Sequence, residues 1–204
     1  MGKVVLDITT SLDGFVAGPG DGPDLPLGEG GERLHEWLFG LASWREPHGL
    51  EGGETNSSSE VLEEGLQASG AVVLGKRMFD NAQGWGDEPP FHKPVFVVTH
   101  TEAEPLAKQG DTTFTFVTDG VESAVEQAKA AAGDKDVSVA GGASIAQQCL
   151  RAGLLDELQI HVAPLLLGGG VRLFDELAGE QIEVEATRVI ESPGVTHLRY
   201  RVVK

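Results

Sequence analysis

The feature that most constrains the fold is an alternation of short apolar runs and helical patterns between residues 71 and 152. The runs AVVLG, PVFVV, TFTFV and DVSVA are rich in β-branched residues, which is typical of buried strands. The segment VESAVEQAKAAA places Val121, Ala124, Val125 and Ala128 on one side of a helix. Strands and helices that take turns along the chain predict a mostly parallel α/β sheet with helices on both faces.

The last third of the chain has a different pattern. The run ELQIHVA places Leu158, Ile160 and Val162 on one face of a strand, and two longer alternating runs, QIEVEATRVIE and VTHLRYRVV, follow it. Because only a Ser-Pro-Gly turn separates these two runs, we expect them to pair antiparallel at the edge of the sheet. The final run offers a long sheet edge that must be covered, which favours a homodimer.

The N-terminal part of the chain predicts a strand, two helices and two loops. VVLDIT is a strand, and the Gly- and Pro-rich stretch 19–31 is a surface loop. The spacing of apolar residues over 34–41 predicts a helix with one buried face that ends between Trp44 and Pro47. Residues 48–59 are polar and Gly-rich, which indicates either a flexible flap or an ordered surface loop, and a short helix is expected at 61–66.

Length and composition favour one folded domain over residues 1–204, because 204 residues is close to the usual size of a single domain and no linker interrupts the pattern. The excess of 32 acidic over 15 basic residues gives a net charge of −17, which repels nucleic acids and anionic lipids. The one cysteine, Cys149, excludes an internal disulfide and a cysteine zinc site, and no histidine spacing indicates a metal site. Because no apolar run reaches about 18 residues and the chain starts like a strand, we expect a cytoplasmic protein without membrane or nucleic-acid partners.

A candidate phosphate site follows the strand DVSVA. Gly141 and Gly142 let a ligand approach the backbone, and the free N–H groups of the next helix, which starts with Ala143, Ser144 and Ile145, favour a phosphate or pyrophosphate. The alternative is a tight turn in which Ser144 caps the helix. The spacing matches neither the GxGxxG fingerprint of dinucleotide-binding folds nor a GxxxxGK[ST] phosphate loop.

Two further strands end in groups that suit a phosphorylated ligand. Lys76 and Arg77 follow the run AVVLG, and Thr99 and His100 end the strand VFVV. Because open α/β sheets bind ligands beyond the carboxyl ends of their strands, we expect these groups and the glycine pair to converge on one ligand. The alternatives are that the two cations neutralise nearby carboxylates such as Asp80, and that His100 is a solvated loop residue.

Three residues are candidates for contact with a substrate. Asp13 follows the first strand and can hydrogen-bond an amide or a hydroxyl, or alternatively form an Asx turn with the loop backbone. Trp37 lies on the apolar face of the expected helix, where a core position is the alternative, and Trp85 lies on a loop where it can cover a pocket.

Gly168 and Gly169 belong to a Gly-Gly-Gly run, which lets backbone pass against a flat ring or simply permits an unusual turn.

Five segments in order carry a resemblance to a known family: SLDGF, VVLGKRMF, VVTH, VAGGASIAQQCL and LLDELQIHVAPLLLGGGVRLF. Together with the final antiparallel pair, they resemble the stand-alone bacterial proteins related to the C-terminal reductase domain of the riboflavin-biosynthesis deaminase/reductase. The resemblance covers nearly the whole chain. It implies a dihydrofolate reductase-like fold, a three-layer α/β/α domain whose central mixed sheet has an antiparallel C-terminal edge.

The resemblance also implies an NADPH site. The implied cofactor contacts are Gly75, Lys76, Arg77 and Met78 for the adenosine and 2′-phosphate, Thr99 and His100 for the adenine-ribose side, Gly141, Gly142, Ala143, Ser144 and Ile145 for the pyrophosphate, and Val16, Ala17, Gly168 and Gly169 for the nicotinamide. Asp13 would be the catalytic residue beside the acceptor, together with Trp37 and Trp85 as substrate contacts. The cofactor would supply the hydride, while the protein aligns it with the acceptor and excludes water.

Two departures from the family pattern narrow the implied function. A fused deaminase domain would need H-x-E and P-C-x-x-C, which a chain with one cysteine lacks. The stretch between Arg33 and Arg77 is acidic and Ser/Gly-rich, with no arginine-rich segment for a ribose phosphate. We therefore expect an NADPH-dependent reductase that transfers a hydride to a small heterocycle such as a pyrimidine or pterin, related to 5-amino-6-(5-phosphoribosylamino)uracil reductase. The alternative is a non-catalytic nucleotide-binding or regulatory protein that retains the fold.

Overall fold

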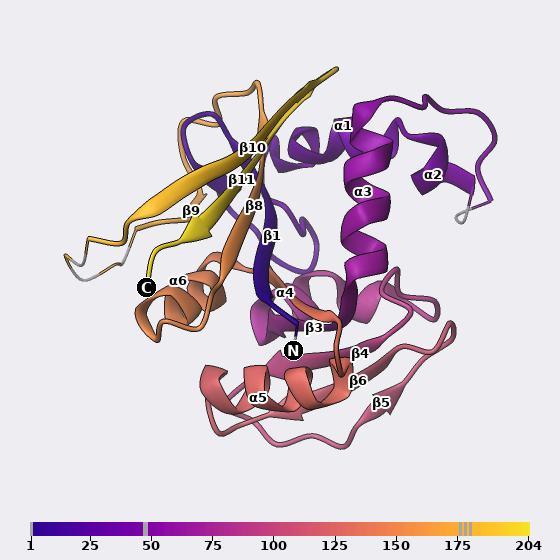
Figure 1. Cartoon of the computed structure of the whole chain (residues 1–204). Helices are drawn as coiled ribbons and strands as arrows, with labels where there is room; N and C mark the ends of the chain where they lie inside the picture. The colour runs from indigo at the N-terminus through magenta and orange to yellow at the C-terminus, as the bar shows by residue number, and fades with distance from the viewer. Residues whose placement is uncertain (1, 47–48, 176, 178, 180) are drawn as a thin grey trace.

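The structure is a computed structural model that describes residues 2–46, 49–175, 177, 179 and 181–204 (Figure 1). The strands of its main sheet span Val4–Ser11 (β1), Ser69–Gly75 (β3), Pro94–Val98 (β4), Leu106–Ala107 (β5), Thr113–Val117 (β6), Asp136–Gly141 (β7), Glu157–Ala163 (β8), Val184–Ser192 (β10) and Val195–Val202 (β11). Their order in the sheet is β10-β11-β8-β1-β7-β3-β4-β6-β5. Strands β8, β1, β7, β3, β4 and β6 pair in parallel, whereas β5, β11 and β10 pair antiparallel with their neighbours. The expected parallel body with an antiparallel C-terminal edge is confirmed.

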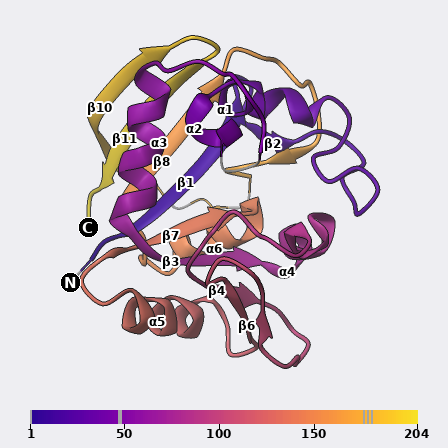
Figure 2. The same ribbon diagram turned by 90° about the vertical axis from the view of Figure 1, so that its right-hand side faces the viewer.

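Helices cover both faces of this sheet, as Figures 1 and 2 show. The longer helices are Ser57–Ala68 (α3), Lys76–Asn81 (α4), Val121–Ala132 (α5) and Ala143–Arg151 (α6). Helices α5 and α6 pack against the main hydrophobic core, which includes Leu6, Val73 and Val139 of the sheet. Helices α3 and α4 lie on the opposite face, where a second core surrounds Phe114. No helix of the described residues is both long and apolar enough to cross a membrane.

The prediction of one continuous helix over 34–41 is wrong, because the chain forms three short helical segments in this region. They are the 3₁₀ helix Gly31–His35 (η1), Glu36–Phe39 (α1) and Ala42–Arg45 (α2). The break occurs at Leu41, which is extended (φ −79°, ψ 138°), and the residues on either side of it hydrogen-bond to the backbone of Glu54. These bonds to the following loop replace helical ones, so tertiary pairing overrides the apolar spacing. The last segment, α2, ends at Arg45, within the expected limits of Trp44 and Pro47, although Pro47 itself lies outside the described residues.

Helix α3 is longer than the short helix expected at 61–66, because a capping box starts it earlier. The Asn56 side chain accepts a hydrogen bond from the Ser58 N–H at 2.9 Å, and the Ser59 hydroxyl accepts one from the Asn56 N–H at 3.3 Å. Residues 48–59 were expected to form either a flexible flap or an ordered surface loop. The bridge between Glu54 and Leu41 favours the ordered loop. The cap therefore fixes the start of α3 over the sheet.

The final run of the sequence is an interior strand, which corrects the expectation of an exposed edge. Strand β11 pairs with β8 on one side and with β10 on the other, so β10 forms the sheet edge. The side chains of Val184 and Val189 on β10 are 40% and 63% exposed. The antiparallel pairing of the last two runs is confirmed, whereas the homodimer stays a prediction.

Two short strands beside the main sheet, Phe15–Ala17 (β2) and Val171–Arg172 (β9), pair antiparallel. A Cβ atom at Gly170, which has a φ of +118°, would lie 2.1 Å from the carbonyl oxygen of Ala17. Only glycine permits this approach of the two chains. The pairing brings Val16 and Ala17 close to the loop that contains Gly168 and Gly169.

Candidate active site

One half of the sheet presents polar side chains to the interior. In β1, Leu6 joins the main core, and the alternation of the strand turns Asp7 and Thr9 to the opposite face. His161 of β8 pairs with Thr9, and His197 of β11 pairs with His161. The two histidines are only 6% and 1% exposed. Buried polar side chains from three neighbouring strands therefore gather on the sheet face that α3 covers.

A cavity of ≈ 260 Å³ lies between this polar face, α3 and the segment around Trp37. Asp7, Thr9 and His161 form its polar wall, and its apolar walls come from Trp37, Leu38, Leu62, Leu66 and Phe91. Met78 and Ala140 also line it. Because Met78 follows β3 and Ala140 belongs to β7, the cavity reaches the carboxyl ends of these two strands.

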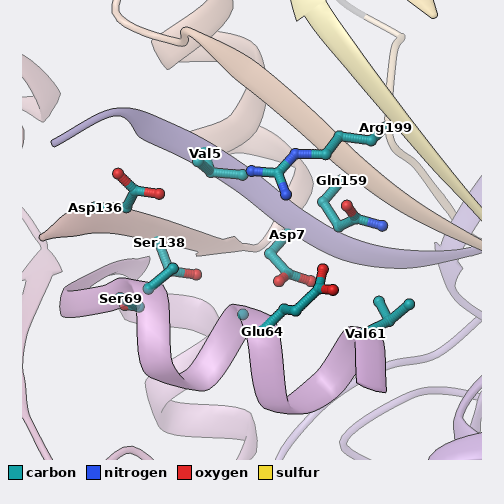
Figure 3. Close-up of a pocket in the computed structure, with 11 residues that line it drawn as sticks. Val5, Asp7, Val61, Glu64, Ser69, Asp136, Ser138, Gln159 and Arg199 are labelled. Atoms are coloured by element: carbon teal, nitrogen blue, oxygen red, sulfur yellow. The ribbon is translucent and has the colours of Figure 1, made fainter. Parts of the chain in front are cut away.

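A smaller pocket of ≈ 50 Å³ adjoins the cavity and shares Asp7, Val61 and Ser69 with it. Figure 3 shows the carboxyl groups of Asp7 from β1 and Glu64 from α3 directed toward the same space. Arg199 of β11 also lines this pocket, and its guanidinium lies 2.6 Å from the carboxylate of Glu157. Asp7 thus stands at the junction of the two spaces.

A row of hydrogen bonds runs from Asp7 away from the cavity. Asp7 Oδ1 lies 2.9 Å from His161 Nε2, and His161 Nδ1 lies 2.6 Å from His197 Nδ1. His197 Nε2 lies 2.9 Å from Ser58 Oγ, at the start of α3. We refer to Asp7, His161, His197 and Ser58 as the Asp7–Ser58 row. Three strands and one helix each contribute one member to it.

Burial keeps two imidazoles of this region neutral at pH 7. The pKa of His197 is lowered to about 4, mainly by burial and also by the adjacent His161, while Asp7 acts in the opposite direction. The pKa of His35 is likewise lowered to about 4, by burial first and then by His161. His35 Nδ1 is buried without a hydrogen-bond partner among the residues that the structure describes. Neither ring therefore adds positive charge to the site.

Trp37 packs over both strand histidines. Its ring centroid lies 5.1 Å from that of His161 and 5.1 Å from that of His197. The indole Nε1 is buried and finds no hydrogen-bond partner within the described part of the chain. Because buried indole N–H groups usually have a partner, this donor on a cavity-lining residue is a candidate contact for a ligand. The substrate contact of Trp37 stays a prediction.

The strand ends expected to converge do lie side by side. Leu74 of β3 pairs with Gly141 of β7, and Gly75 pairs with Val98 of β4. Thr99, immediately after β4, donates its N–H to the carbonyl oxygen of Val117 at the end of β6, at 3.0 Å. The juxtaposition is confirmed, and the binding of a cofactor to it stays a prediction.

The start of α6 is open at this edge of the sheet. Among the residues that the structure describes, no side chain caps the helix, so the Ser144 cap considered as an alternative is not formed. Ser144 Oγ instead accepts a hydrogen bond from Gln148 Nε2 at 3.1 Å. A Cβ atom at Gly142 would meet no atom within 4 Å. A helix N-terminus without a cap and with open space in front of it suits an anionic group.

The two cations after β3 are paired with carboxylates of the protein. Lys76 Nζ lies 2.5 Å from Asp80 Oδ1, which is the pairing considered as the alternative, and Arg77 Nη2 lies 2.6 Å from Asp21 Oδ1. His100 is exposed, as the solvated-loop alternative expects. A phosphate that binds these cations must therefore compete with Asp80 and Asp21.

Asp13 joins two loops and does not line the cavity. Its Oδ1 accepts hydrogen bonds from Ser11 Oγ at 2.5 Å and from the Leu167 N–H at 3.1 Å, and its Oδ2 accepts one from the Gly168 N–H at 2.7 Å. The bond from Ser11 contributes most to a pKa of about 2. A carboxylate that is ionised and engaged in this way cannot donate a proton at pH 7, so the geometry gives the expected catalytic role of Asp13 no support.

Trp85 lies in the second core and not on the cavity wall. Its ring centroid is 4.8 Å from that of Phe91 and 6.3 Å from that of Phe114. Phe91 is the member of this aromatic group that lines the cavity. The pocket-covering position expected for Trp85 is therefore occupied by Phe91.

Comparison with known proteins decides the family. The family model of the RibD C-terminal domain matches residues 2–198. The chain belongs to the RibD C-terminal domain family. The resemblance inferred from the sequence motifs is thus confirmed.

Relatives and solved structures agree with this assignment. The uncharacterized protein YwjB of Bacillus subtilis (strain 168) is 27% identical over 179 residues, which make up 87% of this chain and 86% of YwjB. A putative riboflavin biosynthesis protein from Shewanella sp. PV-4 has a TM-score of 0.69 and 23% identity over 99% of both chains. Dihydrofolate reductase from Enterococcus faecalis, solved with NADP(H), has a TM-score of 0.57 and 13% identity over 100% of this chain and 98% of that one. These likenesses confirm the dihydrofolate reductase-like fold.

Sequence reasoning does not identify the polar row of this RibD C-terminal domain. A signal was nevertheless present, since Asp7 interrupts the apolar run VVLDIT and His161 falls between Ile160 and Val162, on the face opposite the apolar one. Strands of a parallel sheet with both faces covered are normally apolar on both sides. A charged or titratable residue on the second face of such a strand marks a buried polar site, because burial without a partner is costly.

Proposed function

We propose that this RibD C-terminal domain protein is an NADPH-dependent reductase that transfers a hydride to a small planar heterocycle in the cavity. The reaction class is that of 5-amino-6-(5-phosphoribosylamino)uracil reductase. The observation that carries the proposal is the position of the cavity, which is lined by Asp7 and reaches the strand ends beside the open start of α6. A nicotinamide-dependent reductase needs these two adjoining spaces, one for the dinucleotide and one for the acceptor.

The residues at the strand ends fit the phosphates of a dinucleotide. The open backbone at Gly142 and the uncapped N–H groups that follow it would hold the pyrophosphate. Lys76 and Arg77 would bind the 2′-phosphate by exchanging their present carboxylate partners for it, because a bidentate guanidinium–phosphate pair replaces a guanidinium–carboxylate pair of similar geometry. The remaining proposed contacts are Gly75 and Met78 on the adenosine side, Thr99 and His100 at the adenine-ribose, Gly141 and Ala143 to Ile145 around the pyrophosphate, and Val16, Ala17, Gly168 and Gly169 at the nicotinamide.

Asp7 is the acid that we place at the reaction. Bound NADPH would supply the hydride. Reduction of a C=N or C=O bond also requires a proton on the heteroatom, and Asp7 is a carboxyl group that faces the cavity. His161, 2.9 Å away, can donate a hydrogen bond to the carboxylate that remains after this proton is given up. Trp37 and Phe91 form apolar walls that exclude water around the acceptor.

The charge of the cavity favours an acceptor without a phosphate. Among the described residues that line it, Lys93 is the one ammonium or guanidinium group. Its Nζ already donates to the carbonyl oxygens of Leu66 and Ser69, at 3.0 and 2.9 Å. Flat apolar walls and a carboxyl group at one end suit a pyrimidine or pterin ring, whose N–H groups can donate to Asp7.

Calorimetric titration with NADPH and NADH tests the cofactor assignment. NADPH should bind more tightly than NADH, and the double variant Lys76→Ala/Arg77→Ala should abolish this preference. Lys135→Ala, which removes an exposed cation before β7, at the opposite end of the parallel strands, is the matched control and should retain it. Equal binding of the two cofactors by the unaltered protein would contradict the assignment.

Oxidation of NADPH with a panel of pyrimidines and dihydropterins tests the reaction. With an active acceptor, Asp7→Asn should lower kcat by roughly 10²–10⁴-fold and leave NADPH binding unchanged, because the amide keeps the contact with His161 but supplies no proton. Turnover that is unaffected by this substitution would remove Asp7 from the mechanism. Tight NADPH binding without turnover of any acceptor would favour the non-catalytic alternative.

A further inference from the structure

The Asp7–Ser58 row continues beyond Ser58 to the edge of the molecule. Ser58 Oγ donates to Ser192 Oγ at 2.7 Å, and Ser192 Oγ donates to Asn56 Oδ1 at 3.2 Å. Ser192 is 7% exposed and ends β10, and the next two residues, Pro193 and Gly194, are exposed. An unbroken set of hydrogen bonds therefore connects the carboxyl group in the cavity with Ser192, which directly precedes the exposed turn residues Pro193 and Gly194.

Each titratable or hydroxyl member of this connection can both accept and donate a proton. When Asp7 is ionised, His161 donates its Nε2–H to the carboxylate, His197 donates its Nδ1–H to His161, and the Ser58 hydroxyl donates to His197 Nε2. One proton that passes inward reverses every bond. His161 then donates to His197, His197 donates to Ser58, and the hydroxyls point outward to Ser192 and Asn56, which is the direction that the two serine bonds have.

The surroundings do not hold an extra proton on the row. His35 of η1 and Trp37 of α1 pack against it from the cavity side. From β10, Arg188 acts on His197, and its guanidinium lies 2.5 Å from Glu64 of α3. Because burial keeps the pKa of His197 well below neutral, a proton that arrives on this ring passes on and is not retained.

We propose that this connection is a proton relay that supplies Asp7 from solvent. The inference rests on the proposed reductase, in which Asp7 gives a proton to the acceptor. In one transfer, Asp7 protonates the acceptor, His161 gives its Nε2 proton to Asp7, and His197 gives its Nδ1 proton to His161. Ser58 then protonates His197 Nε2, Ser192 protonates Ser58, and a solvent acid protonates Ser192. One proton enters and one leaves, and rotation of the hydroxyls with tautomer exchange of the two rings restores the starting state.

A relay would supply Asp7 with protons while the acceptor covers its exposed side. The Asp7 side chain is 36% exposed, and it lines the ≈ 260 Å³ cavity in which we place the acceptor. The smaller pocket offers a competing route, since ≈ 50 Å³ is enough for water and Asp7 lines it as well. In contrast, His197 is 1% exposed and contacts neither space, so its proton exchange reports on the row itself.

Exchange of the His197 ring proton with water tests the relay without any turnover. Ser58→Ala removes the link between His197 and Ser192, while Ser57→Ala removes a neighbouring hydroxyl that donates to the Glu191 carbonyl oxygen outside the row. In protein with ¹⁵N-labelled histidine, Ser58→Ala should slow this exchange several-fold, and Ser57→Ala should leave it as in the unaltered protein. Equal exchange rates in all three proteins would overturn the relay.

Turnover with NADPH and an acceptor found in the panel gives the second readout. Ser58→Ala should lower kcat several-fold without changing KM for NADPH, raise the solvent deuterium effect on kcat, and regain rate in imidazole buffer. His197→Asn keeps a hydrogen bond to His161 but cannot pass a proton, so it should show the same loss of kcat as Ser58→Ala. It replaces Ser58→Ala in this test if that variant fails to fold. An unchanged kcat in both variants would overturn the relay and assign the proton supply to water in the smaller pocket.

The two readouts separate this inference from the function on which it rests. If no acceptor is reduced, the proposed function fails, and the exchange of the His197 proton still decides whether the row conducts protons. If an acceptor is reduced and Asp7→Asn abolishes the activity while Ser58→Ala does not, the reductase stands and the relay falls.

Discussion

The buried, neutral state of His197 makes a quantitative prediction about stability and pH. In the folded protein the pKa of His197 is about 4, against an ordinary value of 6.5. The unfolded chain therefore binds a proton at this ring between pH 6.5 and 4 that the folded chain does not bind. By linkage, the stabilising contribution of the neutral ring is fully present above pH 6.5 and is lost as the pH falls to about 4.

The size of the effect follows from the two pKa values. The two pKa values differ by about 2.5, and a difference of one in pKa corresponds to about 1.36 kcal/mol. The neutral ring therefore contributes about 3 kcal/mol to the free energy of unfolding at pH 7. His197→Asn removes this titration but retains a polar group of similar size beside His161 and Ser58. The free energy of unfolding of the variant should therefore fall by about 3 kcal/mol less than that of the unaltered protein between pH 7 and 4.

Urea unfolding at pH 7, 6, 5 and 4, followed by tryptophan fluorescence, measures this difference. Trp37 lies against His197, so its emission reports on the region concerned. His100→Asn, at an exposed histidine after β4, is the matched control and should reproduce the pH dependence of the unaltered protein. Identical pH dependence in His197→Asn and the unaltered protein would show that His197 is not held neutral by burial, and would refute the reasoning.

Three further substitutions test other parts of the structure. Asp21→Asn should weaken the ion pair with Arg77 and widen the preference for NADPH over NADH in calorimetric titration, whereas an unchanged ratio would mean that the carboxylate does not compete with the 2′-phosphate. Gly170→Ala should destabilise the protein by at least about 2 kcal/mol in urea unfolding, because its φ is +118° and the new Cβ would lie 2.1 Å from the Ala17 carbonyl oxygen; normal stability would disprove the close approach. Asn56→Ala should cost about 1 kcal/mol in the same assay through loss of the helix cap, and a neutral result would argue against the capping box.

Local periodicity was sufficient to predict the parallel body of the fold. The four residues expected on the buried face of α5, Val121, Ala124, Val125 and Ala128, are all buried there. The apolar strand runs were correct for the same reason, since both faces of these strands contact helices. In contrast, the break at Leu41 depends on hydrogen bonds with Glu54, which lies in a separate loop, and no pattern within the segment encodes it.

In the candidate site, too, the features that follow from local sequence could be predicted, whereas those that depend on contacts between distant segments could not. The strand ends with Gly75, Thr99 and Gly141 were predictable because parallel strands place their carboxyl ends on one edge. The Asp7–Ser58 row was not, because two of its contacts, Asp7 with His161 and Ser58 with His197, join residues more than 130 positions apart in the chain. Asp13 illustrates the converse, since its position beside a strand end suggested catalysis while its hydrogen bonds hold a loop.

A crystal structure of the protein with NADP⁺ would show whether the dinucleotide binds along the strand ends and reaches the cavity. We expect the 2′-phosphate at Lys76 and Arg77, the pyrophosphate at Gly142 and the start of α6, and the nicotinamide at the mouth of the cavity that Asp7 lines. A dinucleotide bound elsewhere, or a nicotinamide separated from that cavity by the side chains of the protein, would contradict this expectation.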